Sequence, residues 1–106
     1  MNVVENAAAR GTQLFEGCKA LMDKYDIIGD VRGGHGLMTA IEMVSDRTTK
    51  NPIDPDTAAI VQEATYQAGA MVRISGPNLI LSPPLVITQQ DATTILSAID
   101  AGFAAV

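Results

Sequence analysis

Two chain reversals marked by glycine and proline most constrain what this chain of 106 residues can fold into. One lies at residues 33–36 and the other at residues 75–78, and each is flanked by two short apolar runs. Glycine adopts positive φ without steric cost and proline cannot donate to a sheet, so both reversals predict tight turns. Two such turns predict two β-hairpins, and hairpins build a mostly antiparallel sheet.

Three segments show the three- and four-residue apolar spacing of amphipathic helices. The first spans residues 3–24. The second begins at Asp54, a favourable N-cap, followed by Pro55 at the first helical position. The third begins at Thr88, with Asp91 placed for a capping box. The resulting order, α-β-β-α-β-β-α, predicts an α+β two-layer sandwich: a small, mostly antiparallel sheet with helices on one face.

The rest of the chain divides into strands and one loop. Strands are expected within residues 27–44, on both sides of the first turn, and over residues 71–74 and 79–81. Residues 45–55 are polar and predict a surface loop, and Gly69 is a favourable stop for the second helix. Residues 1–106 are therefore expected to form a single domain.

The composition excludes several classes of function. Seven basic against 12 acidic residues give a net charge of −5, which disfavours nucleic-acid binding. No apolar run approaches the roughly 18 residues of a membrane span, so we expect neither a nucleic-acid nor a membrane partner. The one cysteine excludes an internal disulfide framework and a multi-cysteine zinc site, and a cytoplasmic location is expected.

Four residues with catalytic potential have simpler interpretations. His35, the only histidine, lies in the first turn and is interpreted as an exposed turn residue rather than a base or metal ligand. Cys18 occupies a core position of the first helix and is interpreted as a small buried side chain rather than a nucleophile. Asp30 and Glu42 are interpreted as surface carboxylates, not as an acid–base pair.

The lysines do not have the surroundings of a covalent catalyst. Lys19 and Lys24 lie on the polar side or at the end of a helix, and Lys50 lies in a polar loop. None is placed where desolvation would lower the pKa of its amine, as Schiff-base chemistry requires. We therefore expect no catalytic residue and no metal ligand in this chain.

Two arginines leave a choice open. Arg73 lies at the end of an expected strand beside a flexible turn, where its guanidinium could bind a carboxylate with two parallel hydrogen bonds. It could equally be a solvated strand-end residue. Arg32, next to the first turn, offers the same choice, with an edge-strand or interface role as the alternative. The residues alone indicate an acidic, soluble α+β domain.

Four stretches, in order and in register, resemble one known family. They are similar to segments of the C-terminal domain of class III (fold type I) pyridoxal-phosphate aminotransferases. Together they cover essentially the whole chain. The stretches are residues 5–11 (ENAAARG), 29–38 (GDVRGGHGLM), 41–50 (IEMVSDRTTK) and 81–88 (LSPPLVIT).

The resemblance implies that the chain is a fragment of a longer enzyme. In the family, a large domain, absent here, binds pyridoxal 5′-phosphate (PLP) and carries the cofactor lysine. The small domain packs on that large domain and closes part of the active-site cleft, usually in a homodimer. The resemblance therefore implies that these 106 residues alone are inactive.

Two positions place the chain within the family. Enzymes acting on ornithine, 4-aminobutyrate or dialkylglycines typically carry an arginine three residues before the proline pair, where this chain has Ile80. Arg73 matches instead a mobile arginine of the amine:pyruvate and ω-amino acid:pyruvate transaminases, which binds the carboxylate of the keto-acid acceptor. The resemblance thus implies amino transfer from an amine or a β-alanine-like ω-amino acid to pyruvate, with Arg73 binding substrate.

Two alternatives stay open. The chain could be a free-standing α+β module that binds a small molecule or regulates a partner. Within the family, it could belong to an ornithine- or 4-aminobutyrate-type aminotransferase, an aminomutase or a dialkylglycine decarboxylase, although Ile80 disfavours the decarboxylase. The reading frame upstream of Met1 distinguishes the free-standing module from the fragment.

Overall fold

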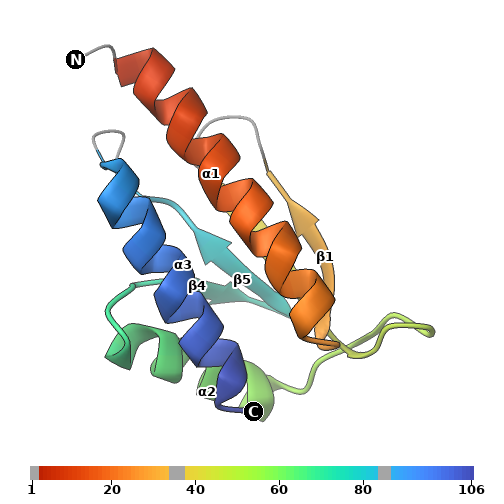
Figure 1. Ribbon diagram of the computed structural model, residues 1–106. Coiled ribbons are helices and arrows are strands. Elements are labelled where there is room, and N and C mark those ends of the chain that lie inside the picture. Colours follow the sequence, from red (N-terminus) through yellow and green to blue (C-terminus); the bar gives the residue numbers. More distant parts are fainter. Residues whose placement is uncertain (1–2, 34–37, 84–86) are drawn as a thin grey trace.

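The computed structural model describes residues 3–33, 38–83 and 87–106, which form helices packed on a small antiparallel sheet (Figure 1). The order of elements agrees with the predicted one, apart from an additional short strand, and the α+β class is confirmed. The elements are α1 (Val3–Lys24), β1 (Ile28–Arg32), β2 (Thr39–Asp46), β3 (Asn51–Pro52), α2 (Pro55–Gln67), β4 (Arg73–Ser75), β5 (Asn78–Leu81) and α3 (Gln89–Ala104).

The four main strands lie in the order β1-β2-β5-β4, and each neighbouring pair is antiparallel. β1 and β2 form the first predicted hairpin, whose turn falls in residues 34–37, outside the described residues. β4 and β5 form the second, where Gly76 has a φ of 59° that favours glycine. The hairpins join through β2 and β5, so residues distant in sequence become neighbours in the sheet.

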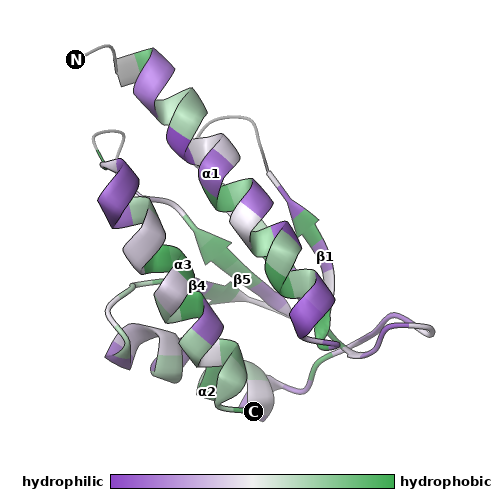
Figure 2. Cartoon of the chain, in the orientation of Figure 1, coloured by the Kyte–Doolittle hydropathy of each residue, from purple (hydrophilic) through white to green (hydrophobic). Residues whose placement is uncertain are grey.

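One face of the sheet forms the core. Val31, Ile41 and Leu79 are buried on this face, side by side in register. Helices α1 and α3 cover it, and α2 packs against α3 near the β4 edge (Figure 1). Figure 2 shows that β5, behind these helices, is mostly hydrophobic. Helical residues that complete the core include Leu14, Cys18, Ile99 and Phe103.

The predicted helix ends are confirmed by their hydrogen bonds. The Asp54 side chain accepts a bond from the Thr57 backbone N–H at 2.9 Å, which caps α2. Gly69, with φ of 115°, follows the end of α2. At α3, the Asp91 N–H donates to Thr88 Oγ1 (3.1 Å) and the Thr88 N–H donates to the Asp91 carboxylate (3.0 Å). This reciprocal pair is a capping box.

The prediction of a plain loop over residues 45–55 is wrong in part. β2 continues to Asp46, and β3 returns to pair with it. The Asp46 carboxylate accepts the backbone N–H groups of Thr48 (2.7 Å) and Thr49 (3.3 Å), which turns the chain back on itself. Both residues of β3 are exposed, so no alternation of apolar residues reveals the strand.

The strand predicted over residues 71–74 also begins later, at Arg73. The amide of Gln62, on α2, donates to the backbone carbonyl of Val72 at 3.0 Å. That carbonyl therefore bonds to the helix, and the chain enters the sheet only at the next residue. As a result, Arg73 is the first residue of the edge strand β4.

Candidate functional site

The face of the sheet turned away from α1 and α3, which we call the open face, carries both arginines that the sequence singles out. Arg32 lies opposite Ala40, Ala40 opposite Ile80, and Ile80 opposite Arg73. These residues form a single row across the four main strands, which we call the arginine row. Its two ends are about 14 Å apart, three spacings of about 4.8 Å.

Arg73 is an exposed cation that forms no ion pair within the described part of the chain. Among the residues that the structure describes, none forms a hydrogen bond or an ion pair with its side chain. Its cross-strand neighbour Ile80 is apolar and half-buried. A guanidinium carries five N–H donors in a planar fork, and here this fork is available to a ligand.

A cavity of about 420 Å³ lies beside Arg73, between the β4 edge and the end of β5. Arg73 and Ser82 are the polar side chains among the described residues that line it. Apolar walls strengthen a hydrogen bond between a cation and an anion, because they reduce screening by water. The cavity therefore suits a small organic anion. Its apolar lining includes Met71, Ile80, Leu81 and Ile95.

Ser82 was not singled out from the sequence. It follows the last residue of β5, and its exposed side chain has no hydrogen-bond partner among the described residues. Two signals could have found it: Ser82 lies two positions after Ile80, and it directly precedes the proline pair of the family-like motif. Its nearness to Arg73, however, depends on the register between β4 and β5.

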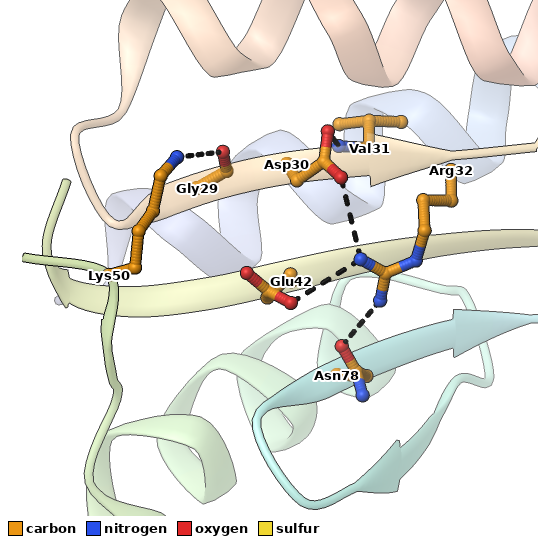
Figure 3. A network of polar contacts seen from close by, with 7 residues as sticks. All are labelled: Gly29, Asp30, Val31, Arg32, Glu42, Lys50 and Asn78. Carbon is orange, nitrogen blue, oxygen red and sulfur yellow. Dashed lines mark hydrogen bonds and ion pairs between the residues drawn. The ribbon is translucent and has the colours of Figure 1, made fainter.

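Arg32, at the other end of the arginine row, contacts three polar side chains (Figure 3). Its Nη1 lies 3.4 Å from an Asp30 carboxylate oxygen and 3.3 Å from a Glu42 carboxylate oxygen, and its Nη2 donates to the Asn78 side-chain oxygen at 3.1 Å. Asp30 and Glu42 thus share one arginine and do not form an isolated acid–base pair. Asn78, which belongs to the second hairpin, was not expected in this network.

The cysteine is buried, as predicted. Cys18 is fully inaccessible in the core, and burial raises the pKa of its thiol to about 12. At neutral pH the group is therefore a thiol and not a nucleophilic thiolate. His35 lies within residues 34–37, outside the described residues, so its predicted role as an exposed turn residue stays a prediction.

None of the three lysines lines the cavity. Lys24 forms an ion pair with Asp100 at 2.9 Å, and the hydrogen bond that its amine donates to this carboxylate raises the pKa of the amine. Lys50 donates to the Gly29 carbonyl at 3.4 Å (Figure 3), and Lys19 lies 6.0 Å from the centre of the Phe15 ring. A lysine that forms a Schiff base with an aldehyde must lose its proton readily. Lys24 therefore does not fit the role of the PLP-binding lysine, and Lys19 and Lys50 lie away from the cavity.

The described ranges also bear on metal binding and on membrane insertion. No group of three or more His, Cys, Asp or Glu residues there could hold a metal ion. In the same ranges, no helix has both the length and the apolar character needed to cross a membrane.

Comparisons with known proteins identify the family. The family model described as "Aminotransferase class-III" matches residues 1–103. A taurine–pyruvate aminotransferase of Bilophila wadsworthia is 41% identical over 112 residues, a match that covers 99% of this chain and 24% of the relative. A hypotaurine/taurine–pyruvate aminotransferase of Paracoccus denitrificans is 38% identical over 105 residues, covering 92% of this chain and 23% of the relative.

A solved structure gives the same answer. The amine transaminase of an uncultivated Pseudomonas species, determined in its PLP-bound form, superposes with a TM-score of 0.91 at 40% identity. The superposition covers 97% of this chain and 23% of that enzyme. The chain thus spans about a quarter of the length of the proteins it matches. Because sequence and fold agree along nearly its whole length, the chain belongs to the class-III aminotransferases, a family of PLP-dependent enzymes.

Proposed function

We propose that residues 1–106 are the C-terminal small domain of a longer PLP-dependent aminotransferase that transfers an amino group from an amine or ω-amino acid to pyruvate. The family match along the chain, and the quarter-length coverage of its relatives, support this proposal. The observation that carries it is Arg73, an exposed arginine without an acidic neighbour among the described residues, beside an apolar cavity.

In this proposal Arg73 binds the carboxylate of the keto acid. A carboxylate accepts two parallel hydrogen bonds from a guanidinium, which fixes its orientation as well as its position. Hydrogen bonds to charged groups contribute about 1.5–3 kcal/mol. Since the side chain begins at the edge strand β4, it can turn toward water when the bound substrate is an uncharged amine.

The cofactor is proposed to be held by residues outside this chain. The surroundings of Lys19, Lys24 and Lys50 support this placement, because none of the three lines the cavity, and Lys24 and Lys50 bond to other groups of the chain. PLP, when bound, supplies the electron sink for proton transfer at the carbon that carries the amino group. This chain would supply the anion-binding wall and help close the cleft, with the large domain and a second subunit as partners in the cytoplasm.

The proposed donors are small molecules with an amino group at one end and an anion at the other. Two relatives are taurine–pyruvate aminotransferases by name, and taurine is an ω-amino sulfonate. A β-alanine-like ω-amino acid has the same layout with a carboxylate. Ile80, apolar and opposite Arg73, leaves a single arginine for either anion, which supports this branch over ornithine- and 4-aminobutyrate-type enzymes.

The test is Arg73→Ala in the longer enzyme that this proposal implies. The ratio of kcat/KM for pyruvate to kcat/KM for propanal, an acceptor without a carboxylate, is expected to fall about 10- to 100-fold, because 1.5–3 kcal/mol is one to two decades in rate. Arg73→Lys keeps the charge but not the fork, so it should recover only part of the ratio. An unchanged ratio in Arg73→Ala would exclude the carboxylate-binding role.

A further inference from the structure

The wall of the cavity next to Arg73 holds a second hydrogen-bond donor. In the antiparallel register Arg73 lies opposite Ile80, and Ser82 follows two residues later, directly after the end of β5. It occupies the position diagonal to Arg73 one residue beyond the paired strands, and both side chains line the cavity. Diagonal neighbours on one face lie on the order of 7–8 Å apart, within reach of a long side chain. A ligand of a few atoms bound to the Arg73 guanidinium therefore comes within hydrogen-bond range of the Ser82 hydroxyl.

The surroundings of Ser82 leave its hydroxyl free for a ligand. The residue is exposed, and no described residue donates to or accepts from its side chain. The next residue, Pro83, also lines the cavity and has no backbone N–H. Among the side chains lining the cavity in the described ranges, only Ser82 can donate a hydrogen bond besides Arg73.

The number of acceptor oxygens then distinguishes two classes of anion. A carboxylate is planar and has two oxygens, both of which an arginine fork satisfies. A sulfonate is tetrahedral and has three oxygens, so one oxygen points away from the fork. That third oxygen needs a donor on a different wall, and an apolar wall would leave it without a partner.

We propose that the Ser82 hydroxyl is a second anion-binding group of this cavity, which donates to the third oxygen of a sulfonate and so favours ω-amino sulfonates over ω-amino carboxylates. This inference rests on the proposed function, because it takes the Arg73 cavity as the substrate-anion site. It makes Ser82 the residue that determines specificity, whereas Arg73 binds both classes of anion.

The experiment compares two unreactive probes of equal length, ethanesulfonate and propionate, on the longer PLP-bound enzyme. Dissociation constants are measured by ligand-observed NMR titration for the wild type, Ser82→Ala, Ser82→Thr and Arg73→Ala. Ser97→Ala is the matched control, since Ser97 is exposed on α3 and outside the cavity. Because neither probe reacts, the result does not depend on turnover.

We expect the wild type to prefer ethanesulfonate and Ser82→Ala to lose about tenfold or more of that preference, the effect of one hydrogen bond to a charged group. Ser82→Thr, which keeps the hydroxyl, and Ser97→Ala should keep the preference. A wild type without preference for the sulfonate, or a Ser82→Ala variant with an unchanged preference, overturns the inference. If Arg73→Ala still binds both probes as the wild type does, the proposed function itself is overturned.

Discussion

Arg32 and Arg73 occupy the two ends of one row on the same face of the same sheet, yet their surroundings differ completely. Arg32 has three oxygen atoms from two acids and one amide within 3.4 Å. Arg73 has no such partner among the described residues. The two side chains have identical chemistry, so neighbouring strands, and not residue type, decide which arginine has acidic partners and which has none among the described residues.

A second row of residues, next to the arginine row, explains why Arg32 has acidic partners and Arg73 does not. In register it contains Asp30, Glu42, Asn78 and Ser75, from β1 to β4. Both acids fall on the β1–β2 half, next to Arg32, whereas the β5–β4 half is neutral. The open face thus carries two carboxylates around one arginine at the β1–β2 edge, and an arginine without a carboxylate in these rows at the other edge, beside the cavity.

The largest effect on acceptor preference is expected when Arg73 is given an acidic partner like those of Arg32. Ile80→Glu places a carboxylate directly opposite Arg73. Arg73 would then have an ion-pair partner, as Arg32 has in Glu42. The new ion pair should compete with the substrate, and the preference for pyruvate over propanal is expected to fall roughly tenfold or more, approaching the Arg73→Ala result. The measurement is the ratio of kcat/KM for the two acceptors in the longer enzyme.

Ile80→Gln is the matched control for that variant, because it has nearly the same shape without the charge. It should retain most of the pyruvate preference. Equal losses in the Glu and Gln variants would mean that the shape of Ile80, and not the charge of Arg73, sets the preference.

The reciprocal change, Arg32→Ala, tests whether the arginine at the other edge affects stability and not acceptor preference. It leaves Asp30 and Glu42 opposite each other without their shared cation. Since these side chains are about one-third to one-half exposed, the expected loss in the free energy of unfolding is only about 1 kcal/mol. Urea unfolding of the chain measures that loss, and the acceptor ratio of the longer enzyme should not move. A tenfold fall in the ratio would contradict the structural role of Arg32.

The smallest effect is expected from Asp100, a carboxylate on α3 that pairs with Lys24. The hydroxyl of Tyr25 and the amine of Lys24 bond to Asp100, which holds the pKa of this carboxyl below its ordinary value of 3.8. A lowered pKa means stability that is present above the pKa of the unfolded chain and lost as the pH falls through the folded value. The difference in free energy of unfolding between wild type and Asp100→Asn should therefore disappear between about pH 5 and pH 2.

Asp23→Asn is the control for that pH dependence, since Asp23 is exposed on α1 and makes no hydrogen bond or ion pair with a described residue. Its difference in free energy of unfolding from the wild type should stay small, because an exposed side chain without a bonding partner contributes little. If the two variants gave the same pH profile, the bonds to Asp100 would contribute nothing measurable.

Structural features that depend on only a few consecutive residues were predictable from the sequence. The Asp54 and Thr88 caps and the glycine of the second turn depend on local geometry alone, so their residue types sufficed. The strand β3 was missed because both of its residues are exposed and its pairing follows from an Asp46 side-chain turn. Sequence patterns carry no signal for such a pairing.

The site was predictable only in part. Arg73 was found at the end of an expected strand beside a turn and by its match to an arginine of the transaminases, but its freedom from acids depends on which residues four strands bring together. Asn78 and Ser82 were missed for the same reason, since each becomes a neighbour of an arginine only through strand register. A register shift of one residue would move all of them to the other face.

The proposed function requires that the Arg73 guanidinium is free to bind the anion of a substrate. A crystal structure of the longer enzyme with propionate bound tests it most directly. We expect the carboxylate to lie in the cavity beside β4, with both oxygens within hydrogen-bond distance of the Arg73 guanidinium nitrogens. A structure in which Arg73 forms an ion pair with an acid of the rest of the enzyme, while propionate binds elsewhere, would contradict it.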